Sequence, residues 1–501
     1  MKRLLIVAVW ALATAWFIRY EAFPEYFTHS MRGYRDLIPH GIVEKDSWMR
    51  LLLKNTPVGY SHTRIETDEA NVSSRYRVEN LTRLNINLMG MQETITVSTD
   101  VKLDALYHLT SFRMSVISRH SATIVSGRRR SGDLFDVTVD TGGNKDRRTV
   151  KIPDDIVIYS QGMDLALSRM TPGESITFRT LEPLTLNPVT ITARALPREL
   201  ITFGPIRTNV AVFAIDYMGS SSRSWVGGDG RVLRTETLLK DLIAEACEPD
   251  EAINSASQHV DAEDLLLDMA VRPNVLITNP RHCSFLNLHV NGVPVKTPGV
   301  KSNRQIPEWQ ADGSLLLTTT AAMIPAQGHD FPQAPLPEEL RIQLNASSFI
   351  QSDHPDIIRL ASSLTSGKTN AMDTAIAICD WVHGNLEKVP SPGVPSAIEV
   401  LRSRKGDCNE HTYLFVALAR AAGIPSNVKI GLVYSETYEA FCYHAWPAVF
   451  AGDWVEMDPT FGQTTVDASH IALIEGEFAE QFALAQMVGR LNITVIKQES
   501  Q

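Results

Sequence analysis

The longest pattern in this chain is a series of β-type segments between about residues 48 and 235. Within these segments apolar and polar residues alternate or β-branched residues are enriched, and Gly, Asn, Asp and Pro separate them. Six segments carry the pattern most clearly: 72–80, 93–102, 122–126, 134–139, 175–180 and 188–195. Such alternation is typical of antiparallel strands with one buried face. We therefore expect an antiparallel β domain over residues 45–250, built as one large sheet or an open barrel.

A second, smaller group of strands follows this domain. Still within the first domain, residues 225–232 surround an Asp-Gly pair and predict a hairpin. A charged stretch over 248–263 then interrupts the strands, with a short helix expected over 261–270. Residues 276–321 return to strand patterning with Asn-Gly and Asp-Gly turns, and a proline-rich connector follows. We expect a small β linker domain over 260–340.

The periodicity changes after about residue 345. Residues 353–363 and 369–386 place apolar side chains at helical spacing, and 397–401 repeats this briefly. The fold class we predict is therefore multidomain, with antiparallel β regions first and an α+β domain over residues 345–501.

One cysteine of this last domain lies at the start of a predicted helix. Residues 406–411 open the helix, which ends at a Gly-Ile-Pro stop over 423–425. Cys408 is therefore expected in the first turn, where free backbone N–H groups and the helix dipole favour the thiolate. The same N–H groups could hold an oxyanion. A buried structural cysteine fits the helix equally well, so a nucleophile also needs a base.

Two predicted strands further along supply that base. His444 lies on a strand over 441–450, and a turn over 451–453 leads into a segment that ends with Asp458. If all three turn residues are unpaired, His444 and Asp458 share a face as diagonal neighbours. If only two of them form the turn, the parity changes and the pair is separated. A catalytic pair thus requires the three-residue loop or a bulge.

The chain at this point resembles the bacterial transglutaminase-like family, part of the transglutaminase and papain-like superfamily of thiol enzymes. The resemblance rests on four ordered blocks: residues 406–411, 418–425, 444–446, and 454 with 458–460. It covers about a third of the chain and implies a transglutaminase-like (papain-like) fold. It also implies a catalytic triad in which Cys408 attacks an acyl carbon, His444 shuttles the proton and Asp458 orients His444.

Other side chains near this motif allow further interpretations. His411 could serve as the base, or as a zinc ligand with Cys408, His444 and Asp458, but no tightly spaced ligand pair supports a metal site. We expect no metal and no cofactor. Trp446 and Trp454 are candidate substrate-binding residues that wall the acyl pocket, although aromatic residues on sheet faces are commonly part of a core.

The remaining cysteines give little evidence for a disulfide framework. The chain has five cysteines in 501 residues, and a disulfide between Cys247 and Cys283 stays open. Cys442 lies two residues before His444 and is expected to be a buried, inert thiol.

The first residues resemble an export address. Lys2 and Arg3 precede an apolar run over 4–18, which Arg19 ends. We expect a signal anchor or signal peptide over residues 1–20, and a protein on the periplasmic or extracellular face that is tethered to a membrane by this segment.

The overall charge makes a nucleic-acid partner unexpected. The 47 basic and 57 acidic residues give a formal net charge of −10. The arginines at 128–130 and 147–148 are the local exception, and we expect them in solvated loops.

Two functions remain from the sequence. The first is an exported thiol enzyme that transfers an acyl group of a protein or peptide through a Cys thioester, by peptide or amide hydrolysis or by transamidation. The alternative is a non-enzymatic binding or assembly protein, in which the β domains recognise an envelope partner and the last domain is a scaffold. The intact set of Cys408, His444 and Asp458 favours the enzyme.

Overall fold

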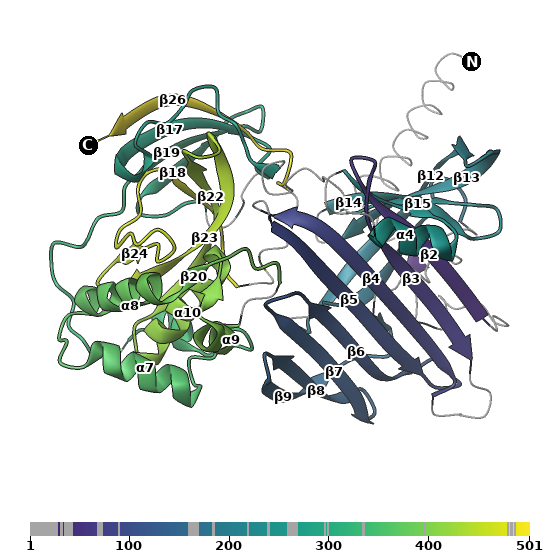
Figure 1. Ribbon diagram of the computed structural model, residues 1–501, viewed down its shortest axis with the longest axis horizontal. Coiled ribbons are helices and arrows are strands. Elements are labelled where there is room, and N and C mark those ends of the chain that lie inside the picture. Colours follow the sequence, from purple (N-terminus) through teal and green to yellow (C-terminus); the bar gives the residue numbers. More distant parts are fainter. Residues whose placement is uncertain are drawn as a thin grey trace, which may run out of the picture.

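The computed structural model arranges the chain around three main sheets (Figure 1). It describes residues 29–30, 34, 44–67, 74–88, 91–158, 170–182, 186–217, 220–237, 241–257, 269–294, 297, 300–332, 336–393, 396–477, 480, 484 and 487–500. The expected export segment over 1–20 and most of the expected helix over 261–270 lie outside these residues. Among the described helices, none combines the length and apolar character that crossing a membrane requires.

The first half of the chain forms one sheet of 16 strands. Its neighbours are antiparallel throughout, except that β1 and β10 both pair with β11 in parallel. Along the sheet the order is β1-β11-β12-β13-β14-β15-β16-β2-β3-β4-β5-β6-β7-β8-β9. The strands are β1 (His29–Ser30), β2 (Glu44–Leu53), β3 (Thr56–Thr67), β4 (Tyr76–Leu88), β5 (Met91–Leu103), β6 (Leu109–Ile117), β7 (Ala122–Ser131), β8 (Leu134–Thr141), β9 (Asn144–Lys151), β10 (Ile156–Val157), β11 (Ser175–Leu181), β12 (Pro188–Phe203), β13 (Ile206–Tyr217), β14 (Ser220–Val226), β15 (Val232–Glu236) and β16 (Leu242–Ala246).

The predicted alternation explains how this sheet buries one face. In β8 the side chains of Phe135, Val137 and Val139 are buried in the core, and their neighbours along the strand are more exposed. The hairpin predicted around Asp229-Gly230 joins β14 to β15 and is confirmed. Helix α4 (Pro249–Ser257) follows β16 and contacts β3.

The placement of the arginine clusters differs from the expectation. Residues 128–130 lie within β7 and residues 147–148 within β9, so they belong to strands rather than loops. Arg129 donates to the carbonyl oxygen of Leu109 and pairs with Asp154 at 2.6 Å. On a strand at the rim of a sheet, every second side chain faces solvent and can be charged. The amino-acid composition of such a strand resembles that of a loop.

A four-stranded sheet follows, in the order β18-β19-β17-β26. Three of its strands lie in the predicted linker region: β17 (Cys283–Asn291), β18 (Gln305–Trp309) and β19 (Leu315–Thr320). The fourth, β26 (Asn492–Ser500), is the last strand of the chain and pairs antiparallel with β17. The small sheet therefore joins two segments that lie far apart in the sequence.

Helices and a third sheet form the rest of the C-terminal region. The helices predicted by apolar spacing are confirmed as α7 (Pro355–Thr365), α8 (Ala371–Asn385) and α9 (Ala397–Ser403), and α10 (Cys408–Ala421) follows. The sheet has the order β24-β23-β22-β25, with β22 (Ser426–Ser435), β23 (Ala440–Phe450), β24 (Trp454–Glu456) and β25 (His470–Glu475). Shorter elements are α6 (Glu338–Arg341), η5 (Pro280–His282), η6 (Ile342–Leu344) and the parallel pair β20 (Glu387–Lys388) and β21 (Lys405–Gly406).

The rim of the large sheet contacts this C-terminal region. Thr141, at the end of β8, lies within hydrogen-bond distance of Ser396 and Gln351. Arg148 donates to Ser348, which donates to Asp146 at 2.8 Å. The contact reaches the segment before α9, and the large sheet thus supports the C-terminal helices.

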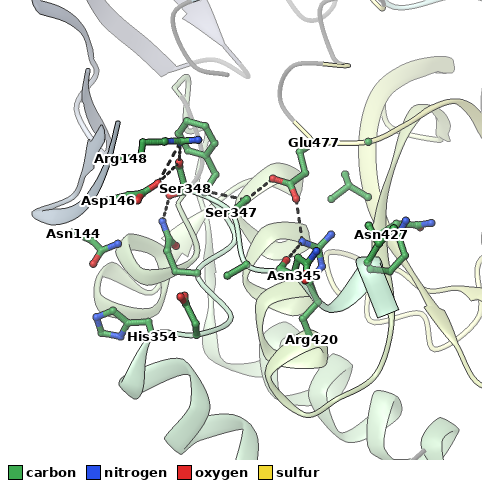
Figure 2. A pocket seen from close by; sticks show the side chains of 18 of the residues that line it. Asn144, Asp146, Arg148, Asn345, Ser347, Ser348, His354, Arg420, Asn427 and Glu477 are labelled. Atoms are coloured by element: carbon green, nitrogen blue, oxygen red, sulfur yellow. Dashed lines mark hydrogen bonds and ion pairs between the residues drawn. The ribbon is translucent and has the colours of Figure 1, made fainter. Parts of the chain in front are cut away.

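A cavity of about 960 Å³ lies beside this contact (Figure 2). Its walls come from β9, from residues 342–355, from Arg420, Asn427 and Val428, and from residues 475–477 with Glu480. Charged side chains in it are paired across short distances, as in Arg420 with Glu477 at 3.0 Å. The sequence-predicted residues Cys408, His444 and Asp458 are not part of its lining.

Candidate active site

Cys408 is the first residue of α10, as the sequence predicts. Asp407 caps the helix by accepting from the backbone N–H of Asn409 at 3.0 Å, and Glu410 accepts from the backbone N–H of Asp407 at 2.9 Å. This capping box satisfies two backbone donors at the helix start. Gly406 makes room for it, because a Cβ there would lie 2.2 Å from the Glu410 side chain. The start of α10 is therefore fixed by local residues.

The environment of the Cys408 thiol differs from the expectation. Burial raises its pKa well above the usual range, and the Asp407 carboxylate raises it further, while a hydrogen bond with the backbone of Ala445 lowers it. Burial therefore opposes the thiolate that the N-terminal position on the helix favours. A thiol with a raised pKa needs a base beside it when it reacts.

The hairpin between β23 and β24 has the three-residue loop on which the pairing of His444 and Asp458 depends. Phe450 pairs with Trp454, and Ala448 pairs with Glu456, so residues 451–453 form the loop. His444 Nε2 lies 2.8 Å from Asp458 Oδ2, and both residues are buried. Cys408 contacts the backbone of Ala445, the residue after His444. The three predicted residues are thus gathered where α10 meets β23.

Hydrogen bonds fix the Asp458 carboxylate on both of its oxygens. Oδ1 accepts from the backbone N–H groups of Thr460 at 2.7 Å and Phe461 at 3.2 Å. Oδ2 faces His444 and also lies 3.1 Å from Nε2 of His470. Burial raises the pKa of Asp458, but the two histidines lower it by more, so the net pKa is well below its usual range. Asp458 is therefore ionised.

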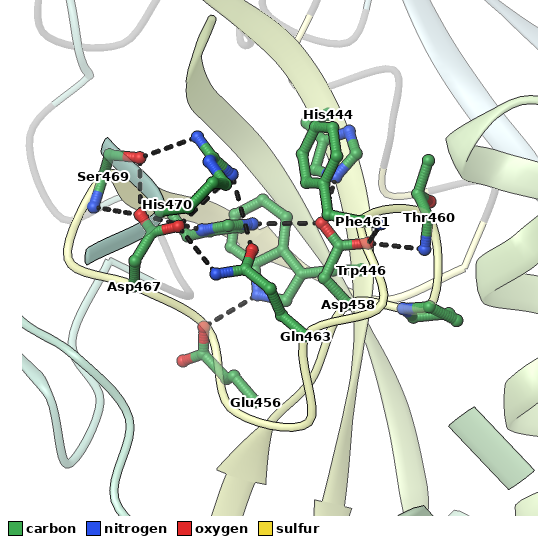
Figure 3. A network of polar contacts seen from close by, with 12 residues as sticks. His444, Trp446, Glu456, Asp458, Thr460, Phe461, Gln463, Asp467, Ser469 and His470 are labelled. Atoms are coloured by element: carbon green, nitrogen blue, oxygen red, sulfur yellow. Dashed lines mark hydrogen bonds and ion pairs between the residues drawn. The ribbon is translucent and has the colours of Figure 1, made fainter. Parts of the chain in front are cut away.

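His470 and its partner Asp467 were not predicted from the sequence (Figure 3). His470 is the first residue of β25 and is fully buried, with Nδ1 3.3 Å from Asp467 Oδ1. It reaches Asp458 because β25 pairs with β22, on the other side of which lies β23. A short Val-Asp-Ala-Ser-His run carries no spacing that distinguishes it from a loop, so sequence patterning offers no signal for this contact.

Aromatic rings surround His444. Trp446 is fully buried, stacks on His444 with ring centroids 5.9 Å apart and donates from Nε1 to Glu456 at 2.8 Å. Phe461, which is 42% exposed, stacks on His444 at 5.1 Å. Trp454 is half-buried and lies edge-on against Phe450 at 5.9 Å. The substrate-binding role of Trp446 and Trp454 stays a prediction, and Phe461 is a third aromatic side chain beside the site.

The other candidates of the sequence analysis have distinct environments. His411 is buried and donates from Nδ1 to the Asp407 carbonyl at 2.7 Å, and burial lowers its pKa. Cys442 is half-buried, and burial raises its pKa to about 11. All five cysteines lie among the described residues and are free thiols, so Cys247 and Cys283 form no disulfide.

One group of described residues brings potential metal-ligating atoms within 4.8 Å of one another: His444, Asp458 and His470. The Nε2 atoms of both histidines already face Asp458 Oδ2 at hydrogen-bond distance. Hydrogen bonding alone therefore accounts for the cluster, and we assign no metal to it. The zinc set considered from the sequence differs, because it combined Cys408 and His411 with His444 and Asp458.

A close backbone contact at Gly431 leads to a first prediction. Gly431 pairs with His444 in β23, and a Cβ on it would lie 1.9 Å from the carbonyl oxygen of Ile471 in β25. Gly431→Ala should therefore push β25 outward and lower the free energy of unfolding by about 1–3 kcal/mol, the usual cost of overpacking. Chemical denaturation of the full chain measures this. The control is Gly384→Ala in α8, where an added Cβ meets no atom within 4 Å. Gly367→Ala would be a poor control, because Gly367 has a positive φ. An equal effect of Gly431→Ala and Gly384→Ala would contradict the prediction.

Comparisons with known proteins agree with this geometry at the family level. The model of the transglutaminase-like superfamily matches residues 358–459, a segment that includes Cys408, His444 and Asp458. No curated protein matches the chain.

Several solved structures resemble parts of the chain at low identity. A candidate cysteine protease from Cytophaga hutchinsonii is 16% identical, with 44% of this chain and 90% of that chain covered and a TM-score of 0.29. A β-barrel-like protein of unknown function from Brucella abortus is 10% identical, with coverage of 41% and 94% and a TM-score of 0.30. The periplasmic domain of TgpA from Pseudomonas aeruginosa is 14% identical, with coverage of 40% and 94% and a TM-score of 0.25.

The family match and the position of the three residues within it lead to one conclusion. Behind a large β-rich N-terminal region, this chain carries a transglutaminase-like domain.

Proposed function

We propose that this protein is a thiol enzyme that transfers acyl groups through a thioester on Cys408. The observation that carries the proposal is the buried 2.8 Å contact between His444 Nε2 and Asp458 Oδ2, formed directly beside the thiol at the start of α10. A base oriented by a carboxylate next to a nucleophile is the arrangement that activates cysteine in acyl transfer.

The residues support the following steps. His444 donates from Nε2 to Asp458, which leaves Nδ1 as the acceptor that can take the thiol proton. Sγ of Cys408 then forms a bond to the acyl carbon of the substrate, and the backbone N–H of Cys408 is a candidate donor to the oxyanion, since the Asp407 cap already takes that of Asn409. The protonated His444 gives its proton to the leaving amine as the acyl–nitrogen bond breaks, and a thioester remains.

The second half of the reaction decides the product. Attack of water on the thioester gives peptide or amide hydrolysis, and attack of an amine gives transamidation. We favour hydrolysis of a protein or peptide substrate, because transamidation requires a site that excludes water. The proposal extends to an α+β, papain-like fold for this domain. It also extends to export and membrane tethering through residues 1–20, and this part rests on the sequence pattern alone.

The raised pKa of the Cys408 thiol predicts an unusual alkylation profile. We expect iodoacetamide to label Cys408 with a pH midpoint above the roughly 8.5 of a free thiol, because burial raises its pKa. At pH 7 labelling should depend on His444, and His444→Ala should slow it by about tenfold or more. Site-resolved mass spectrometry of the full chain measures both, with half-buried Cys442 as the internal control.

The first of two informative results bears on the pKa of the thiol, and the second bears on the thiol-enzyme function. A midpoint below that of a free thiol would contradict the raised pKa. Labelling of Cys408 that is unaffected by His444→Ala would remove the base and favour the non-enzymatic scaffold. Turnover itself can be followed with p-nitrophenyl acetate, whose acetyl group passes to Cys408 as p-nitrophenolate leaves, and then with peptides and amines.

A further inference from the structure

His470 lies between two carboxylates inside the protein. Its Nε2 is 3.1 Å from Asp458 Oδ2 and its Nδ1 is 3.3 Å from Asp467 Oδ1, and all three side chains are buried (Figure 3). A neutral imidazole has one N–H and can donate to only one of them. An imidazolium can pair as an ion with both carboxylates, and Nε2 is the nitrogen that forms a hydrogen bond.

Asp467 is held in place by several donors. Its Oδ1 accepts from the backbone N–H and the hydroxyl of Ser469 at 2.8 and 2.5 Å. Its Oδ2 accepts from Gln463 Nε2 at 2.9 Å and pairs with Arg281 at 3.2 Å. Burial raises the pKa of Asp467, but His470 and Arg281 lower it by more, so Asp467 is ionised.

The charged groups around His470 come from every element that packs against it. His444 faces His470 from β23, and Asp458 faces it from the segment after β24. Arg304 donates to the carbonyl oxygen of His470 at 2.6 Å and also pairs with Glu456. Burial lowers the pKa of His470, but Asp467 and Asp458 raise it by more, so the net pKa is raised above its usual value. The two carboxylates therefore favour the protonated form of His470.

We infer that His470 is a positioning residue that holds the Asp458 carboxylate toward His444 and, in its protonated form, places a positive charge behind it. This role rests on the thiol-enzyme function proposed above. Two imidazoles then share one carboxylate oxygen. A cation at His470 disfavours a second positive charge on His444.

The test separates this charge from simple hydrogen bonding. His470→Gln keeps an N–H donor toward Asp458 and removes the charge. The full chain is assayed with p-nitrophenyl acetate, and kcat/KM is measured against pH, where the acid limb reports the base of the free enzyme. We expect the acid limb of His470→Gln to move up by about one to two pH units, because one ring nitrogen of each histidine lies within 4.8 Å of the other.

Two further variants complete the design. His289→Gln is the matched control, because His289 bonds to Ser314 in the small sheet and should leave the acid limb unchanged. Asp467→Asn removes the carboxylate behind His470 and should also move the limb upward. It gives a second measurement if His470→Gln fails to fold.

The outcomes distinguish the two proposals. A Cys408-dependent rate whose acid limb coincides in the wild type, His470→Gln and Asp467→Asn, with unchanged unfolding temperatures, would overturn the role of His470 alone. Equal rates for the wild type and Cys408→Ala would overturn the thiol-enzyme function and with it the role of His470. A limb that moves in both variants and stays in His289→Gln supports the inference.

Discussion

Cys408→Ala should reduce the turnover of p-nitrophenyl acetate to the uncatalysed background, a loss of roughly 10⁴-fold or more. The thiol is the atom that bonds to the acyl group, and His444 and Asp458 have nothing to activate without it. The fold should survive, because Cys408 is half-buried and its helix starts with a capping box made by Asp407 and Glu410.

Cys442→Ala is the matched control for this substitution. Cys442 is also half-buried, lies on β23 two residues before His444 and has no contact with Asp458 among those the structure gives. It should retain close to full turnover. Far-UV circular dichroism and the unfolding temperature check that both variants fold. Turnover retained in folded Cys408→Ala would contradict the mechanism.

Arg304→Met should lower the free energy of unfolding by about 3–5 kcal/mol. Arg304 and Glu456 form a 2.7 Å ion pair in which the side chains are only 3% and 2% exposed. Arg304 also donates to Thr319 and to the carbonyl oxygen of His470, so it connects the small sheet to the sheet that holds the site. Removing it leaves a buried carboxylate to which, among the described residues, the Trp446 indole still donates.

The size of this effect should depend on pH. In the wild type, burial raises the pKa of Glu456 but Arg304 lowers it by more, so the net pKa is below its usual value. Its contribution to stability is therefore present above about pH 4.5 and is lost as the pH falls. In Arg304→Met the main group that lowers that pKa is gone, and only Lys429 and the Trp446 indole still oppose burial, so the pKa of Glu456 rises and the variant gains less stability than the wild type as the pH rises. The deficit should grow between pH 4 and pH 8.

Chemical denaturation at the two pH values measures this, with Arg359→Met as the control. Arg359 pairs with Asp356 on the surface of α7 and is 73% exposed, so its loss should cost less than about 1 kcal/mol. An Arg304→Met deficit no larger than that of Arg359→Met, or one that shrinks as the pH rises, would contradict the role of this ion pair.

The parts of the site that the sequence predicts are those with local signals. The start of α10 is marked by a capping residue and its end by a Gly-Ile-Pro stop, and the pairing of His444 with Asp458 follows from the parity of a three-residue loop. Helices α7 and α8 likewise follow from apolar spacing along one segment.

The features that the sequence does not predict depend on non-local packing. His470 reaches Asp458 only because β25 and β23 flank β22, and Arg304 meets Glu456 across two different sheets. The pKa of Cys408 depends on what covers the thiol, which the helix position alone does not reveal. Arg128 lies in a strand rather than a loop because its neighbours along β7 pair with β6 and β8.

The pairing of β17 with β26 has a consequence for folding during synthesis. Asn291 at the end of β17 faces Asn492, which the ribosome adds about two hundred residues later. At typical elongation rates the edge of β17 waits for roughly 10–40 seconds without its final neighbour. An unpaired edge of this kind can capture other strands, so we expect the nascent chain to be most prone to aggregation in this interval.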